Sequence, residues 1–261
     1  MTGTTLLLSA AEQRLQFGLA RDGALVFGQD WAAASQGVEL LAPILAAAMG
    51  RLNLPFSSID RIACVTGPGG FTGLRLALAT ASALHHTLRV PLAGINYLEL
   101  LAEGSPCLPG QAVRVLTHAR RELVCCQDFR RCAEGYVVPL TEPCIVKTCA
   151  AFENLPVLAP YATLLVGNGL SRHPKLREHA ACAAFMADLH DQPSWEAFLR
   201  LAGRAAYAKA DLAPLYLRAS EAEDNLEMLA ERRGDDPAQA RIALRSLLDR
   251  APTDAIRGCN G

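Results

Sequence analysis

The chain has 261 residues, a net charge of −1, a hydrophobic fraction of 51% and a charged fraction of 20%. These values are typical of a globular protein with one large domain or two of moderate size, and they exclude a strongly basic nucleic-acid-binding chain. Nine cysteines without a Cys-x-x-Cys pair argue against a disulfide framework or a zinc ribbon, so we expect a cytoplasmic protein. No apolar run approaches the roughly 20 residues of a membrane span, and the start lacks a basic region, so we expect neither membrane association nor a signal peptide.

Hydrophobic periodicity predicts the elements of the first half in chain order. Three short strands separated by turns predict an antiparallel meander, and strands then alternate with helices. Ser35 is a plausible cap for the first helix. The expected strands are 4–9, 15–19, 25–31, 60–66 and 90–95, and the expected helices are 38–50, 72–86 and 96–102.

The second half repeats the beginning of this order after a segment rich in glycine and proline, 104–110, which we interpret as a linker. Strands are expected at 113–118, 122–129 and 136–140, and a later one at 164–166 precedes Gly167-Asn168-Gly169. The likeness indicates a weak internal duplication. We therefore predict two domains, 1–103 and 104–220, and a charged helical C-terminal extension, 221–261, in which Asp236 caps a helix.

A glycine-rich loop joins the strand at 60–66 to the helix after it and consists of Gly67, Pro68, Gly69, Gly70 and Phe71. A strand, a glycine turn and a helix start can bind an anion. However, the loop lacks the Gly-Lys-Ser/Thr ending of a P-loop, and its glycines do not have the dinucleotide-binding spacing. The pattern favours a structural loop in which the glycines permit a tight turn, Phe71 is anchored in the core and Thr72 caps the helix.

The run from Gly67 to Arg75 resembles the Gly-Pro-Gly-Ser-Phe-Thr-Gly-Leu/Val-Arg segment of TsaB proteins, with Gly70 at the Ser position. Corroborating stretches follow in the same order as in that family, over about residues 4–220. They are the helix 38–45, which is similar to a Leu-Leu-Pro helix, Ala119–Val124, the Gly-Asn-Gly loop, and Pro214-Leu215-Tyr216-Leu217-Arg218.

The resemblance implies an α/β fold with two ribonuclease-H-like domains, related to actin and the sugar kinases, with mixed sheets flanked by helices. It also implies a non-catalytic subunit that pairs with a catalytic relative, TsaD. With an ATPase, TsaE, they place a threonylcarbamoyl group on the adenosine beside the anticodon of certain tRNAs. We expect no cofactor in this chain, ATP and metal on the partner subunits, indirect contact with tRNA, and a homodimer when the chain is alone.

Kinases and ATPases of this superfamily place a carboxylate on the first hairpin of each half, where it serves metal and phosphate. Here the corresponding positions are Ser9 and His118, and we interpret the nearby Glu12 as part of a surface turn. These residues argue against an alternative function as an ATP-dependent phosphotransferase. A hydrolase with Cys125 as nucleophile stays open, although packing of Cys125 and Cys126 in a hairpin core is favoured. We assign no catalytic, cofactor or metal residues.

The helices at 38–50 and 72–87 are unusually rich in Ala and Leu, and the second is apolar nearly all round. Such a helix is buried on two sides, against its own sheet and against either a partner or another layer of the same chain. The resemblance favours a partner, because TsaB proteins pair through these two helices. The predicted interface residues are Leu41, Leu45, Thr72, Gly73, Arg75, Leu76, Ala77 and Thr80.

Overall fold

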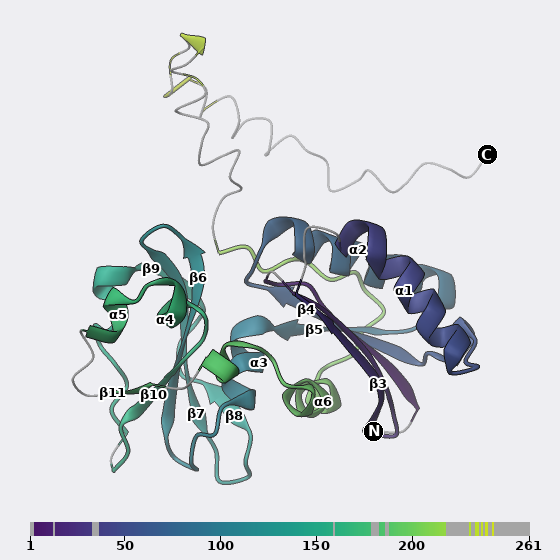
Figure 1. Cartoon of the computed structure of the whole chain (residues 1–261), viewed down its shortest axis with the longest axis horizontal. Coiled ribbons are helices and arrows are strands. Elements are labelled where there is room, and N and C mark those ends of the chain that lie inside the picture. The colour runs from purple at the N-terminus through teal and green to yellow at the C-terminus, as the bar shows by residue number, and fades with distance from the viewer. Residues whose placement is uncertain are drawn as a thin grey trace. The chain divides into compact units, whose positions relative to one another are not determined.

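Two mixed β-sheets form the framework of the protein, seen here in a computed structural model (Figure 1). Contacts within the chain separate a first unit, Met1–Leu217, from a second unit, Arg218–Gly261. The structure describes residues 3–12, 14–32, 37–158, 160–178, 183–185 and 188–217, together with a few positions between 230 and 242. The expected cap Ser35 lies outside the described residues.

The first sheet has the order β3-β2-β1-β4-β5. Its first three strands form the predicted antiparallel meander, and β4 and β5 then add in parallel with β1. Short turns suffice for the meander, whereas each parallel strand follows a helix. The strands are β1 (Thr4–Ser9), β2 (Leu15–Arg21), β3 (Ala24–Trp31), β4 (Arg61–Gly67) and β5 (Leu92–Asn96).

The second sheet repeats this arrangement in the order β8-β7-β6-β10-β11. Strand β6 pairs antiparallel with β7 and parallel with β10, as β1 does with β2 and β4. The predicted duplication is therefore confirmed at the level of strand order. The strands are β6 (Ala112–Arg120), β7 (Leu123–Arg131), β8 (Val137–Pro139), β10 (Thr163–Val166) and β11 (Ala183–Phe185), with β9 (Cys144–Lys147) as a further partner of β7.

Helices cover both sheets, which confirms the predicted α/β class with mixed sheets flanked by helices. Helices α1 and α2 pack on one face of the first sheet, and α3 and α6 contribute to the core on its other face (Figure 1). The helices are α1 (Gly37–Arg51), α2 (Phe71–Leu88), α3 (Tyr97–Gly104), α4 (Gly169–Arg172), α5 (Lys175–Glu178) and α6 (Trp195–Arg204), with short 3₁₀ turns at Phe56–Ser58, Thr148–Ala150 and Asp188–Asp191.

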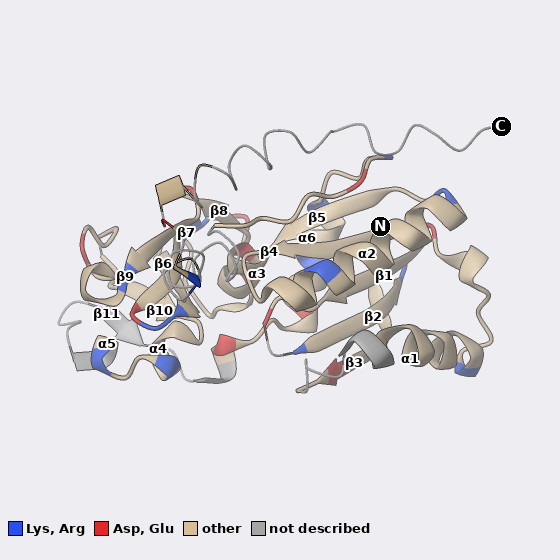
Figure 2. Ribbon diagram, turned by 90° about the horizontal axis from the view of Figure 1, so that it is seen from above, with Lys and Arg blue, Asp and Glu red and all other residues tan. Residues whose placement is uncertain are grey.

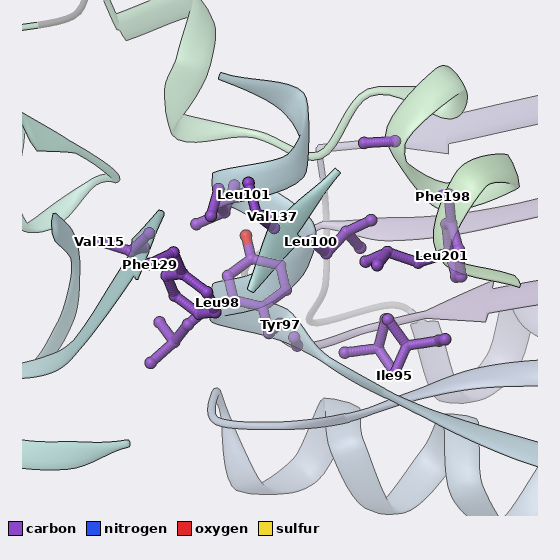
Figure 3. Packing of buried hydrophobic residues seen from close by; sticks show 14 of the residues in the cluster. Ile95, Tyr97, Leu98, Leu100, Leu101, Val115, Phe129, Val137, Phe198 and Leu201 are labelled. Atoms are coloured by element: carbon purple, nitrogen blue, oxygen red, sulfur yellow. The ribbon is translucent and has the colours of Figure 1, made fainter. Parts of the chain in front are cut away.

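Alternation along β1 divides the core into layers. Leu6 and Leu8 are buried with α1 and α2, whereas Leu7 faces the opposite side. That side holds the largest apolar cluster, in which α3 meets residues of both sheets. Figure 3 shows Leu98 and Tyr97 of α3 beside Phe129 of the second sheet, with α6 on the other flank. Helix α3 therefore joins the two sheets through a shared core.

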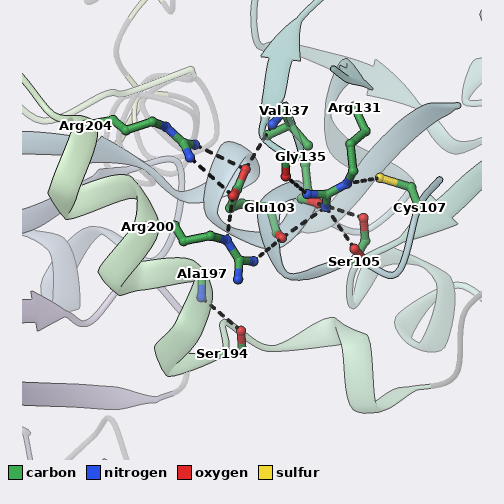
Figure 4. Close-up of polar contacts among 11 residues, drawn as sticks. Glu103, Ser105, Cys107, Arg131, Gly135, Val137, Ser194, Ala197, Arg200 and Arg204 are labelled. Atoms are coloured by element: carbon green, nitrogen blue, oxygen red, sulfur yellow. Dashed lines mark hydrogen bonds and ion pairs between the residues drawn. The ribbon is translucent and has the colours of Figure 1, made fainter. Parts of the chain in front are cut away.

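A buried carboxylate fixes the end of α3 (Figure 4). The Glu103 side chain is fully buried and accepts the backbone N–H of Val137 at 3.0 Å, while Arg200 and Arg204 pair with it at 2.7 and 3.2 Å. Burial alone raises its pKa, but the Val137 N–H and the two guanidinium groups outweigh burial, so the pKa of Glu103 lies below its ordinary value. The carboxylate thereby ties α3 to β8 and α6.

The predicted linker, 104–110, is bonded to the second sheet rather than free. The buried guanidinium of Arg131 donates to the carbonyls of Glu103 and Ser105 and to the Cys107 sulfur, at 2.9–3.1 Å. Both sheets belong to one unit that ends at Leu217, and the predicted division at residue 103 stays a prediction.

Five elements of the second half have no counterpart among the predicted ones, namely β9, α4, α5, β11 and α6. A signal for α6 was present, because Ser194 caps it by accepting the N–H of Ala197, and its apolar residues recur at helical spacing. In the second unit, Asp236 accepts the N–H of Ala238 at 2.9 Å, as expected for the predicted cap. Most of that extension lies outside the described residues.

Replacing the buried carboxylate should destabilise the protein. Glu103→Gln leaves two guanidinium groups without their anion, so we expect the free energy of unfolding at neutral pH to fall by about 2 kcal/mol in urea titrations. Because the folded pKa is depressed, the loss should shrink as the pH falls through it. Glu99→Gln, one turn earlier on α3, is the control: burial raises the pKa of Glu99, so its neutralisation should cost little. Equal losses in both variants would contradict this role of Glu103.

Candidate functional site

The backbone of the glycine-rich loop is in direct contact with the backbone at the end of β1. The N–H of Gly70 donates to the carbonyl of Ala11. A Cβ on Gly69 would lie 1.9 Å from that same oxygen, and a Cβ on Gly73 would lie 2.1 Å from the oxygen of Ala10. Only glycine permits this approach. Because a protein carbonyl takes the N–H at the helix start, the geometry favours the predicted structural loop over an anion cradle.

The second half contains the same kind of contact between glycines and a backbone carbonyl. Gly167 and Gly169 follow β10, and a Cβ on either would lie 2.4 or 2.7 Å from the carbonyl oxygen of Leu116 in β6. Gly167 also has a φ of 107°, a conformation that favours glycine. In each half, the loop after the fourth strand of the repeat is thus packed onto the first strand.

The start of α2 differs from the prediction in two respects. The helix begins at Phe71, and Gly70 occupies the cap position without a side-chain cap, so Thr72 is not the cap. Phe71 is 36% exposed rather than anchored in the core, and its ring stacks on Tyr216 with centroids 5.2 Å apart. The stacking explains the difference, because it gives the ring an apolar neighbour at the surface.

Tyr216 belongs to an extended segment, Ala205–Leu217, that follows α6 and lies along the first sheet. Ala208 bridges to Leu92 of β5, and the N–H of Leu215 donates to the carbonyl of Thr66 at 2.8 Å. Asp211 accepts from Ser82 and His86 of α2. The glycine-rich loop, which carries the specific part of the family resemblance, and Pro214–Leu217, one of the corroborating stretches, are therefore in direct contact.

Arg75 joins these two stretches. Its Nε donates to the hydroxyl of Tyr216 at 3.1 Å, and its guanidinium lies 3.7 Å from the centre of the Phe71 ring. We call these three residues, Phe71, Arg75 and Tyr216, the aromatic clamp. All three are exposed, so the clamp is a surface feature at the first turn of α2.

The predicted interface residues fall into three groups. Leu41, Leu45 and Ala77 are buried in the core beneath α1 and α2. Gly73, Leu76 and Thr80 are half-buried, and Thr72 and Arg75 are exposed. Besides Thr72 and Arg75, the exposed residues of the two helices include Ala42, Pro43, Ala46, Ala47, Ala79 and Ala83. We call the surface that these exposed residues form the α1/α2 face.

The described part of the α1/α2 face is almost uncharged. Within residues 41–51 and 71–88, Arg51 and Arg75 are the two Lys, Arg, Asp or Glu residues, and Figure 2 shows both helices largely tan. Exposed helix surfaces are usually rich in charge. Depletion of charged residues is typical of the buried core of a protein–protein contact.

The ends of the first hairpins lie close together in space, which the sequence could not show. Asn168 accepts the backbone N–H of His118 at 2.8 Å and also hydrogen-bonds to Glu12. Burial raises the pKa of Glu12 to about 7, although Asn168 and Arg172 act in the opposite direction. Glu12 lies in the bend after β1, as interpreted from the sequence, but its carboxyl is half-buried and interacts with Asn168 and Arg172.

The described side chains give little support for metal or thiol chemistry. His118 and His173 lie 3.0 Å apart through their ring nitrogens, but among the described residues no group of three potential metal ligands gathers. Cys125 and Cys126 are buried in the hairpin, as expected, and burial raises the pKa of Cys126 to about 12, which disfavours a thiolate. No described helix is long and apolar enough to cross a membrane.

Substitutions should distinguish the glycines at which a Cβ would clash with a backbone oxygen, such as Gly73, from Gly70, which has room for a side chain. Gly73→Ala places a methyl group against a backbone oxygen, so we expect a loss of about 3 kcal/mol in the free energy of unfolding. Gly70→Ser is the control, because a Cβ there meets its nearest atom at 3.6 Å and a serine can cap α2. It should be neutral or gain a few tenths of a kcal/mol. The reverse ranking in thermal unfolding would contradict the packed loop.

The raised pKa of Glu12 predicts a pH dependence with a definite sign. The folded pKa lies above the unfolded value, so the stabilisation is present below about pH 4.5 and is lost as the pH rises through about 7. Glu12→Gln does not titrate. Between pH 5 and pH 8, the wild type should lose roughly 2 kcal/mol relative to this variant in urea titrations. A constant difference across this range would contradict the buried position.

Sequence comparisons connect the chain with a family. A model of the family described as TsaD: tRNA N6-adenosine threonylcarbamoyltransferase matches residues 32–185. An uncharacterized protein of Mycobacterium tuberculosis is 31% identical over 188 residues, or 71% of this chain and 76% of that protein. The tRNA N6-adenosine threonylcarbamoyltransferase of Clostridioides difficile is 37% identical over 67 residues, 26% of this chain and 20% of that enzyme.

Solved structures match a larger part of the chain. YeaZ from Pseudomonas aeruginosa superposes with a TM-score of 0.67 at 21% identity, covering 83% of this chain and 100% of that one. A second Pseudomonas aeruginosa protein, described as similar to peptidase YeaZ, gives 0.69 at 22% identity, covering 84% and 100%. These structures show the shared fold and confirm the predicted resemblance to TsaB (YeaZ) proteins. Since the family model covers more than half of the sequence, the chain belongs to the family described as TsaD: tRNA N6-adenosine threonylcarbamoyltransferase.

Proposed function

We propose that this chain is a non-catalytic subunit that pairs with a TsaD-like catalytic subunit in the formation of tRNA threonylcarbamoyladenosine. A TsaE-like ATPase completes the set, and ATP and metal bind to the partner subunits. The chain contacts tRNA through the complex, acts in the cytoplasm and forms a homodimer when alone. The family match and the YeaZ-like fold support the part of this proposal that places the chain in tRNA modification.

The observation that carries the proposal is the α1/α2 face. Ala42, Ala46 and Ala47 of α1 and Ala79 and Ala83 of α2 are exposed, and the two helices contact each other. Small side chains allow a partner helix to approach closely, and an uncharged surface loses little hydration free energy when it is covered. A surface of this composition on two adjacent helices supports a role in subunit pairing.

The ends of the first hairpins support a non-catalytic role. Ser9 is buried at the end of β1, and the backbone N–H of His118 is bonded to Asn168 at the end of β6. Neither side chain supplies the hard, anionic oxygen that a magnesium–phosphate complex requires. The nearby Glu12 is bonded to Asn168, and its raised pKa keeps part of it protonated near neutral pH.

Reconstitution tests the proposal. The full chain is co-purified with the TsaD of the same cell, and modification of a substrate tRNA is measured with TsaE, with and without this chain. We expect a stable complex and modification that depends on the chain. Full modification without the chain would overturn the proposal, and ATP hydrolysis by the chain alone would favour the phosphotransferase instead.

A charge placed on the α1/α2 face should weaken pairing without unfolding the protein. Ala46→Glu and Ala79→Glu are each expected to lower the affinity for TsaD at least tenfold, because a carboxylate in an apolar contact loses its hydration. Isothermal titration calorimetry gives the affinity, and circular dichroism checks the fold. Ala133→Glu, in an exposed turn of the second sheet, is the matched control and should bind like the wild type. Unchanged affinity in all three variants would exclude this face.

A further inference from the structure

The aromatic clamp holds Arg75 in one orientation. The ring of Phe71 lies under the guanidinium, the hydroxyl of Tyr216 accepts from Nε, and the two rings stack on each other. A free arginine loses considerable side-chain entropy when it is immobilised in a contact. In this clamp much of that side-chain entropy is already lost on folding, so binding through Arg75 costs less entropy.

Within the described part of the chain, these are the two partners that the structure gives Arg75. Nε is used by Tyr216, whereas the Nη groups have no acceptor among the described residues. The terminal N–H groups of a guanidinium form a planar fork that matches a carboxylate in a bidentate pair. Within α2, Arg75 is the one Lys or Arg, and the exposed Ala79 follows one turn later on the helix.

We propose that Arg75 is the specificity-determining contact of the α1/α2 face and pairs with an aspartate or glutamate of the TsaD-like subunit. The inference rests on the proposed function and names the chemistry of the partner's surface. A fixed arginine beside aromatic rings, surrounded by uncharged residues, has the composition of an interface hot spot. The apolar neighbours exclude water from the ion pair and thereby strengthen it.

Charge complementarity favours a different protein over a second copy of this chain. Within residues 41–51 and 71–88, the parts of α1 and α2 whose side chains the structure describes, there is no Asp or Glu. Asp211, from the adjoining extended segment, already accepts hydrogen bonds from Ser82 and His86 of its own chain. A second copy therefore offers no unengaged described carboxylate at this place, whereas a partner of different sequence can.

The test compares the full chain carrying Arg75→Glu, Arg75→Lys or Tyr216→Phe for affinity to TsaD, measured by calorimetry. Charge reversal should weaken binding about 100-fold, and Arg75→Lys, which keeps the charge but loses the fork, about 10-fold. Tyr216→Phe should weaken it severalfold, because it removes only the acceptor that orients Nε. Arg21→Glu, an exposed charge reversal at the end of β2, is the control and should bind like the wild type. Circular dichroism verifies that each variant is folded.

Rescue identifies the acidic partner. Surface Asp and Glu residues of TsaD are changed singly to Arg, and one of them should restore the affinity of Arg75→Glu while weakening that of the wild type. If wild-type chain binds TsaD and Arg75→Glu binds equally well, the inference is wrong and the proposed function stands. If Arg75→Glu instead abolishes only self-association, a second copy occupies the site and the inference is also wrong. If the wild type does not bind TsaD at all, the proposed function itself fails.

Discussion

The contact between the glycine-rich loop and the end of β1 is the constraint on which the surface of the molecule depends. The carbonyl oxygens of Ala10 and Ala11 occupy the space that side chains at Gly69 and Gly73 would need. This contact fixes where α2 begins and which of its sides faces the sheet. Consequently Leu74 and Ala77 are buried, while Phe71 and Arg75 emerge at the surface. Gly167 and Gly169 make the same contact with the backbone of Leu116, so this glycine contact is part of the internal duplication.

Helix α3 provides the second constraint, because it packs against both sheets in the same apolar core. Its apolar residues fill the core that the sheets share, and its last turn is held by the buried Glu103 and by the guanidinium of Arg131. A single apolar core would leave the two halves free to slide. Directional hydrogen bonds to Val137 and to backbone carbonyls remove that freedom, since each requires a specific orientation of its partner.

Much of the fold could be predicted from the sequence because its signals are local. Strand β1 matches its predicted bounds, since a short apolar run between turns has few alternatives. The position of Phe71 could not be predicted, because Tyr216 reaches it from a segment far along the chain. The contacts of Glu12 could not be predicted for the same reason, because Asn168 and Arg172 belong to the other half. The buried Leu41, Leu45 and Ala77 show a different limit: an almost wholly apolar helix does not reveal which side faces its own sheet.

The aromatic clamp unites an early and a late part of the first unit. Phe71 and Arg75 are synthesised long before Tyr216, which lies at the end of the segment that follows α6. During translation, the helices and most of the two sheets can form while Arg75 still lacks the hydroxyl that orients it. The clamp is therefore complete only in a chain whose synthesis has passed Tyr216.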